Sequence, residues 1–127
     1  MTNCNCNIYE QGVAGEMRAW STYTLYFAPT EPYTYEDLAE CYISAVYAGE
    51  VLFRLSMSDA VVDFEKGALA WSLTQEQTGS LPVGQRVAFY FDPLTNDGER
   101  GDIPPMVVEI TKSGVDGAIP ISEVDNE

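Results

Sequence analysis

The stretch that decides the fold is residues 67–91, GALAWSLTQEQTGSLPVGQRVAFYF. Large apolar residues recur at every second position in two rows, which are Leu69, Trp71 and Leu73, then Val87, Phe89 and Phe91. This period of two is typical of strands that are buried on one face. The polar residues 74–82 between the rows predict a one-turn helical corner, in which Thr74 caps the turn and Leu81 returns to the core. The segment therefore predicts strand, corner and strand.

Similar alternation continues on both sides of this segment. It predicts strands over residues 17–27, 41–47, 51–57, 60–64 and 106–110, with turns at 48–50, 65–67 and 96–98. On the first of these strands, Met17 and Phe27 lie on one face and Trp20 and Tyr26 on the other. Residues 35–42 fit either a strand or one face of a helix. The pattern as a whole indicates an all-β chain.

Length and charge limit the classes of protein. The 127 residues suit one domain, and the net charge of -14 disfavours binding to nucleic acid or to an anionic membrane. There is no histidine, so the commonest general base and metal ligand is missing. No segment resembles a signal peptide or a membrane span. Three cysteines, two of them close to the first residue, do not suggest a disulfide framework.

The corner also carries a family resemblance. Residues 67–84 resemble the G-x-φ-x-φ-x-L-T-x-E-Q-T-x-x-L-P-x-G stretch of immunoglobulin-like domains in bacteriophage virion proteins, such as the baseplate upper protein N-terminal domain and fibre- or head-attached proteins. Gln11-Gly12, and Asp37-Leu38 followed by residues 41–47, fit the same template, so the resemblance covers residues 8–112. The chain departs from it in the longer, acidic loop 92–105 and in the cysteine-containing arm.

The resemblance implies an antiparallel immunoglobulin-like β-sandwich of about seven strands with a short helical corner. We expect residues 1–7 to be a flexible cysteine-containing arm and residues 8–112 to be the sandwich. Residues 113–127 are either an acidic tail or, through 118–121, an added edge strand. The implied function is that of a non-catalytic virion structural protein of a head fibre, head decoration, neck or tail baseplate, assembled in the bacterial host cytoplasm. Its expected partners are other virion proteins and further copies of itself.

The candidate contact residues are outward-facing aromatics and loop residues, because Trp, Tyr and Arg dominate interface hot spots. They are Trp20, Tyr26, Tyr42, Tyr90, Asp97 and Arg100. Trp20 is the first choice among them.

Other motifs have simpler explanations. Cys4 and Cys6 offer too few ligands for a thiolate metal site, and Cys41 adds only one more. The acids at 59, 63 and 65 and at 97, 99 and 102 lack a recognised calcium-loop spacing. No cofactor and no enzymatic activity are expected. The Arg100-Gly101-Asp102 tripeptide is explained by chance in a turn.

Two alternative functions come from other classes. The charge of -14 allows an acidic DNA mimic that inhibits a host defence nuclease, although the acids are spread over turns and both ends of the sequence. The exposed aromatics allow a carbohydrate-binding module.

Overall fold

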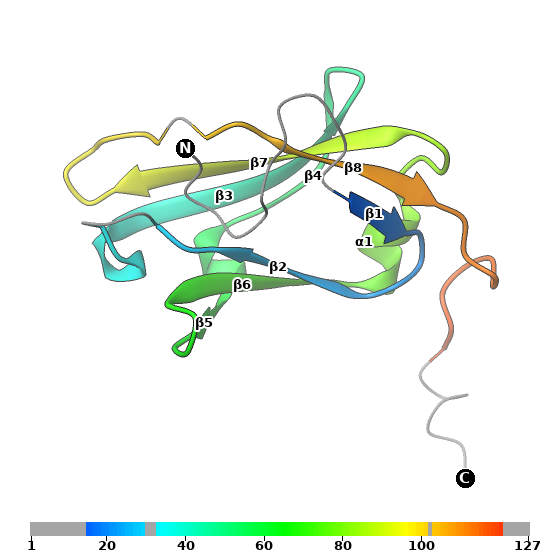
Figure 1. The fold of residues 1–127 in the computed structure, drawn as a ribbon, viewed down its shortest axis with the longest axis horizontal. Coiled ribbons are helices and arrows are strands. Elements are labelled where there is room, and N and C mark those ends of the chain that lie inside the picture. The colour runs from blue at the N-terminus through cyan, green and yellow to red at the C-terminus, as the bar shows by residue number, and fades with distance from the viewer. Residues whose placement is uncertain (1–14, 30–32, 102, 121–127) are drawn as a thin grey trace, which may run out of the picture.

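The computed structural model describes residues 15–29, 33–101 and 103–120. This part of the chain forms eight strands, one short α-helix and two 3₁₀ turns (Figure 1). The strands are β1 (Gly15–Arg18), β2 (Tyr23–Phe27), β3 (Leu38–Tyr47), β4 (Glu50–Leu55), β5 (Val61–Asp63), β6 (Ala68–Leu73), β7 (Arg86–Thr95) and β8 (Met106–Thr111). The helix is α1 (Gln75–Gly79), and the 3₁₀ turns are η1 (Tyr35–Asp37) and η2 (Met57–Asp59). The prediction of a mostly β chain is confirmed.

The strands form two sheets. One has five strands in the order β1-β8-β7-β3-β4, and the other has three in the order β2-β6-β5. All strand pairs are antiparallel except β1 with β8, which is parallel. The expected antiparallel pairing therefore holds for every strand pair but this one. After β1 the chain turns and enters β2 in the other sheet, so β1 does not form a hairpin with a sequence neighbour.

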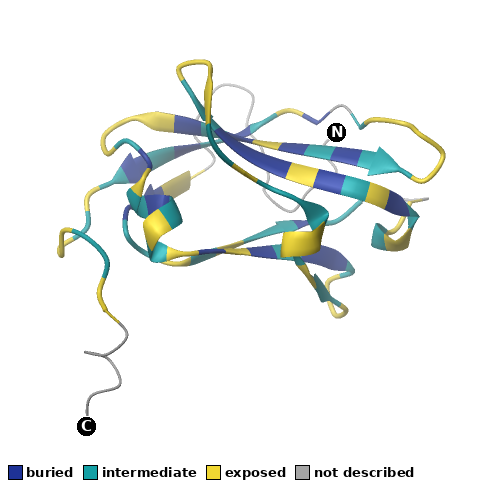
Figure 2. Cartoon of the chain, turned by 180° about the vertical axis from the view of Figure 1, so that it is seen from behind, coloured by how far each residue is buried: buried dark blue, intermediate teal, exposed yellow. Residues whose placement is uncertain are grey.

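The two sheets share one core (Figure 1). Phe27 of β2 stacks on Phe91 of β7 with ring centroids 5.8 Å apart, and Trp71 of β6 lies 6.2 Å from the same Phe91 ring. The indole N–H of Trp71 donates to the Ser56 carbonyl at 2.9 Å, so the buried ring keeps its hydrogen bond. Buried bands alternate with more exposed bands along the strands in Figure 2, as the period of two predicts.

The corner forms as predicted. The Thr74 hydroxyl accepts from the Gln77 N–H at 3.1 Å, and the Gln77 side chain accepts from the Thr74 N–H at 2.8 Å, which is a complete capping box. Thr78 is buried, and its hydroxyl donates to the Ser21 carbonyl at 2.7 Å. All six residues that the pattern assigned to the core are buried, namely Leu69, Trp71, Leu73, Leu81, Val87 and Phe89. The corner carries the chain from the three-stranded sheet into the five-stranded one.

The predicted strand over residues 17–27 was wrong as one element. The structure divides it into β1 and β2, which belong to different sheets. Trp20 lies in the turn between them with φ of 67°, a left-handed conformation that is uncommon for a bulky residue. Its ring covers Gly79 so closely that a Cβ there would lie 2.3 Å from the indole. Packing against α1 therefore breaks the strand where local alternation would continue it.

The structure also shows the conformation of residues 35–42 and of the turn at 48–50. Residues 35–37 form η1, and the strand alternative holds from Leu38 onward. The β3–β4 turn has positive φ at Ala48 and Gly49, as a two-residue hairpin requires.

Residues 118–120 form no strand, but the backbone of Ile119 both donates to and accepts from the Gln75 amide, at 2.8 and 3.2 Å. The expected arm at 1–7, the first residues of the expected sandwich at 8–14, and residues 121–127 lie outside the described residues.

Candidate protein-contact face

Two of the predicted contact residues lie close together on the outer face of the five-stranded sheet. Tyr42 is opposite Asp92 in the β3–β7 pairing, and Tyr90 is opposite Ser44, two residues away along each strand. Both tyrosines point away from the core, with 42% and 38% of their surface exposed. Diagonal neighbours on one sheet face are within reach of each other's long side chains. The sheet therefore presents a pair of aromatic residues to solvent.

Charged side chains surround this pair. The Arg54 guanidinium lies 5.9 Å from the centre of the Tyr42 ring, and its Nε donates to the Ser44 hydroxyl at 2.8 Å. Arg100 pairs with Asp92 at 3.2 Å. Together these groups form a groove of ≈ 360 Å³ lined by Glu40, Tyr42, Arg54, Asp92, Leu94 and Arg100. We call Tyr42, Tyr90 and these groove residues the tyrosine face.

Most of the basic residues of the chain lie on this side of the sheet. Four of the six basic residues belong to it or to its rim, and these are Arg18, Arg54, Arg86 and Arg100. The strands place them by alternation, since Met17 and Val87 beside them are buried. A mixed face with arginines and tyrosines matches the residue types that are enriched at protein interfaces.

Glu40 is fixed in the groove by backbone hydrogen bonds. One oxygen of the Glu40 carboxylate accepts from the N–H groups of Cys41 and Met57, at 3.0 and 2.9 Å. Cys41 is buried behind it, and burial, followed by the charges of Asp92 and Glu40, raises the pKa of its thiol to about 12. A thiol with so high a pKa stays protonated at neutral pH and is a poor nucleophile and metal ligand. Cys41 therefore offers the tyrosine face neither a reactive thiol nor a metal ligand.

The other predicted contact residues lie elsewhere. Trp20 is half-buried against α1, so the structure does not support it as the leading contact residue. Tyr26 points outward from the three-stranded sheet, under the Lys66 ammonium 5.1 Å from its ring centre. Asp97 lies in the turn after β7 and accepts a hydrogen bond from the Thr95 hydroxyl. Of the six candidates, Tyr42, Tyr90 and Arg100 are brought together.

The turn acids have local structural roles. Asp59 accepts from the Ser56 N–H at 2.9 Å, and Asp63 accepts from the Lys66 N–H at 3.2 Å. Within residues 15–29, 33–101 and 103–120, no group of three or more acids or cysteines could hold a metal ion. Cys4, Cys6 and Asp102 lie outside the described residues.

Sequence reasoning missed Arg54, Asp92 and Glu40. In the predicted strand 51–57, Arg54 alternates with Phe53 and Leu55, and this outward position is the signal that the sequence offers. Only the register of β3 with β4 and β7 shows that it lies beside Tyr42 and Tyr90.

Comparison with known proteins adds no relative. No protein-family model and no curated protein matches the chain. No helix in the part of the chain that the structure describes has the length and apolar character needed to cross a membrane.

Proposed function

We propose that this chain is a non-catalytic, immunoglobulin-like structural module of a bacteriophage virion. In this proposal it assembles with other virion proteins, and with further copies of itself, in the cytoplasm of the bacterial host. The tyrosine face makes the contact. The position in the particle would be a head fibre, head decoration, neck or tail baseplate.

Strand order supports the immunoglobulin-like part of the proposal. The order β8-β7-β3-β4 facing β2-β6-β5 corresponds to strands G, F, C and C′ facing B, E and D of a variable-type immunoglobulin domain. Antibody domains join strands B and F by a disulfide that packs against a tryptophan. Here Phe27 and Phe91 stack between the corresponding strands, and Trp71 packs on Phe91. An aromatic cluster thus takes the place of the disulfide.

The tyrosine face is the observation that carries the assembly role. A pair of exposed tyrosines flanked by Arg54 and Arg100 offers large contact area at a small cost in side-chain entropy. Glu40, Arg54 and the Arg100–Asp92 pair already make hydrogen bonds within the chain, which hold these groups of the groove in place for a partner. The resemblance of residues 67–84 to phage virion domains supplies the virion context.

The test is incorporation into particles. Phage particles banded in a density gradient from a host that carries the parent gene should contain peptides of this chain by mass spectrometry. A Tyr42→Ser/Tyr90→Ser variant should be incorporated at least about tenfold less, because interface tyrosines each contribute about 1–2 kcal/mol or more. Val61→Ser is the matched control, since Val61 is 70% exposed on the other sheet. Particles without the chain, or full incorporation of the double variant, would refute the proposal.

A carbohydrate ligand is the second candidate for the same face. Aromatic rings beside carboxylates and guanidinium groups can stack on sugar rings and bind hydroxyls, and the groove volume of ≈ 360 Å³ is at the small end of ligand pockets. Saturable binding on a glycan array that is lost in Tyr42→Ser/Tyr90→Ser would favour this candidate.

A further inference from the structure

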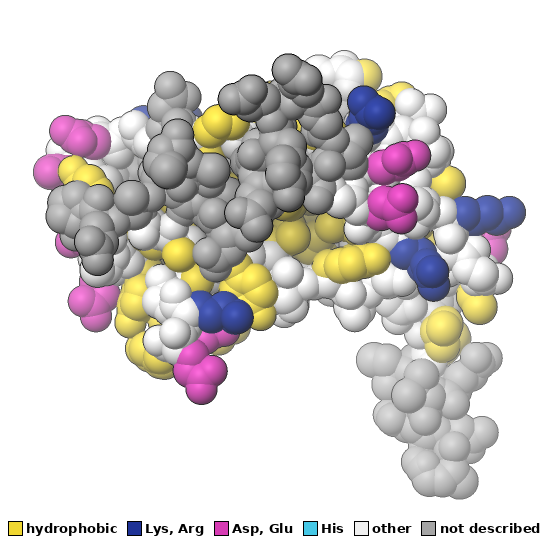
Figure 3. Space-filling model, viewed as in Figure 1, with side chains coloured by type: hydrophobic (Ala, Val, Ile, Leu, Met, Phe, Trp, Pro, Cys, Tyr) yellow, Lys and Arg dark blue, Asp and Glu magenta, His cyan; other side chains and the backbone are white. Residues whose placement is uncertain are grey.

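Three loops meet at the end of the molecule opposite α1. They are η1, which lies directly before β3, the turn between β5 and β6, and the hairpin after β7 (Figure 1). Asn96 joins the hairpin to η1, because its N–H donates to the Asp37 carbonyl at 2.8 Å and its side chain donates to the Glu36 carbonyl at 3.2 Å. Tyr35 joins η1 to the β5–β6 turn through an edge-on contact with Phe64 at 6.3 Å. In Figure 3 acidic side chains and an apolar cluster are visible at this end.

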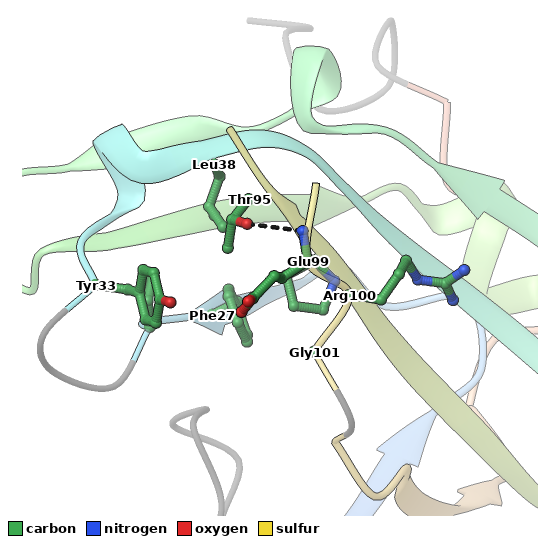
Figure 4. A pocket seen from close by; sticks show the side chains of 9 residues that line it. Phe27, Tyr33, Leu38, Thr95, Glu99, Arg100 and Gly101 are labelled. Atoms are coloured by element: carbon green, nitrogen blue, oxygen red, sulfur yellow. Dashed lines mark hydrogen bonds between the residues drawn. The ribbon is translucent and has the colours of Figure 1, made fainter. Parts of the chain in front are cut away.

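A small pocket opens between the sheets at this end (Figure 4). Its floor and walls are apolar and come from Phe27, Pro29, Leu38 and Pro93. Its volume is ≈ 110 Å³, smaller than the pockets of about 300 Å³ or more that hold whole small molecules. The space therefore suits a single side chain rather than a metabolite.

The rim of the pocket is polar and negative. Glu99 is held by two hydrogen bonds with Thr95, one from the Glu99 N–H to the Thr95 hydroxyl at 3.0 Å and one from the Thr95 N–H to the Glu99 carbonyl at 2.9 Å. Figure 4 shows the Glu99 carboxylate on the side of Phe27 and Tyr33, whereas the Arg100 guanidinium points away from them. The nearest basic group is thus turned toward the tyrosine face, where it pairs with Asp92.

Other acids strengthen the negative potential. A neighbouring hollow shares Tyr33 and is lined by Asp37 and Asp97. The charges of Glu99 and then Asp97 raise the pKa of the Tyr33 phenol above its ordinary value. A group that enters this pocket from solvent therefore passes carboxylates before it reaches the apolar walls.

We propose that this pocket receives a lysine or arginine side chain of a partner protein. The side chain would lie across the mouth of the pocket, with its methylene stem on Phe27, Leu38 and Pro93 and its cationic head paired with Glu99 at the rim. Lysine and arginine combine a long apolar stem with a cationic tip, which matches apolar walls beside a carboxylate. A charge-assisted hydrogen bond to a carboxylate is about twice as strong as a neutral one. This pocket shares Arg100 with the groove of the tyrosine face, and the proposal does not depend on the virion role.

The test is a titration of the whole chain, labelled with ¹⁵N, with Nα-acetyl-lysine amide. We expect saturable shifts of the Thr95, Glu99 and Gly101 amide signals, with a dissociation constant on the order of 1–10 mM for so small a probe. Nα-acetyl-norleucine amide keeps the stem but lacks the charge and should bind about tenfold more weakly. Calcium chloride at the same ionic strength should not reproduce the shifts, since a bare ion makes no use of the apolar walls.

Substitution of Glu99 separates pocket binding from general attraction to an acidic protein. Glu99→Gln should weaken binding of the lysine probe about tenfold. The variant should fold normally, because Glu99 makes its hydrogen bonds with Thr95 through its backbone. Glu76→Gln on α1, at the other end of the molecule, makes the same change in charge and should leave the affinity unchanged. The proposal would be overturned if the lysine and norleucine probes bind equally well, or if the two variants change the affinity equally. It would also be overturned if the lysine probe gives no saturable shift at concentrations well above the expected dissociation constant.

Discussion

Replacement of Thr78 by valine tests the hydrogen bond that joins the helical corner to the connection between β1 and β2. Thr78 is fully buried, and its hydroxyl donates to the Ser21 carbonyl at 2.7 Å and to the Gln75 carbonyl at 3.2 Å. Valine has nearly the same shape, so Thr78→Val creates no large cavity. What it removes is the donor, which leaves the Ser21 carbonyl without this partner.

The expected cost follows from that loss. A buried polar group that loses its hydrogen-bond partner lowers the free energy of unfolding by about 1–3 kcal/mol. The lower end applies if water reaches the carbonyl, since Ser21 itself is half-buried. For a domain of this size the melting temperature should fall by about 3–5 °C for each kcal/mol.

Urea unfolding followed by tryptophan fluorescence measures the effect, because the buried Trp71 lies on the strand that leads into the corner. Thr24→Val is the matched control. Thr24 is exposed on β2, so the same change of side chain should alter the free energy of unfolding by no more than about 0.5 kcal/mol. If Thr78→Val and Thr24→Val are equally stable, the hydrogen bond to Ser21 does not hold the corner in place and our reasoning is wrong.

Three further predictions concern stability. Thr74→Ala removes the helix cap and should lower the free energy of unfolding by about 1 kcal/mol in the same urea experiment. No change in this free energy would mean that the capping box does not stabilise the fold. Gly79→Ala places a methyl group against the rigid Trp20 ring and should cost about 1–3 kcal/mol by thermal unfolding, and a stabilised variant would contradict this packing. Burial raises the pKa of Cys41 from 9.0 to about 12, so the unfolded chain binds fewer protons between these values and stability should fall with rising pH, by up to about 1.4 kcal/mol per pH unit. This slope should be smaller in Cys41→Ala when unfolding is measured from pH 8 to 10.5, and equal slopes would refute the assignment.

Local patterns predicted the start of the corner well because its capping contacts are local. The capping box joins residues three apart, and the rows that include Trp71 and Phe89 need only a period of two. The break at Trp20 could not be predicted in this way, because it depends on Gly79, which is distant in the sequence. Alternation alone continues a strand through any residue that tolerates extended backbone.

The contact face was predictable in part. Tyr42 and Tyr90 could be placed on outward faces from alternation alone, and both are exposed there. Their closeness depends on the register between β3 and β7, and the approach of Arg54 depends on the register between β3 and β4. Register between strands is a tertiary property that a single sequence pattern does not determine.

Tyrosine nitration in the free chain and in the assembled particle tests the central claim most directly. In the free chain, tetranitromethane should modify Tyr42 and Tyr90, which are both exposed. In purified particles both should be protected, whereas Tyr26 on the other sheet should react as it does in the free chain. Equal reaction of Tyr42 and Tyr90 in the two states, read by peptide mass spectrometry, would contradict assembly through the tyrosine face.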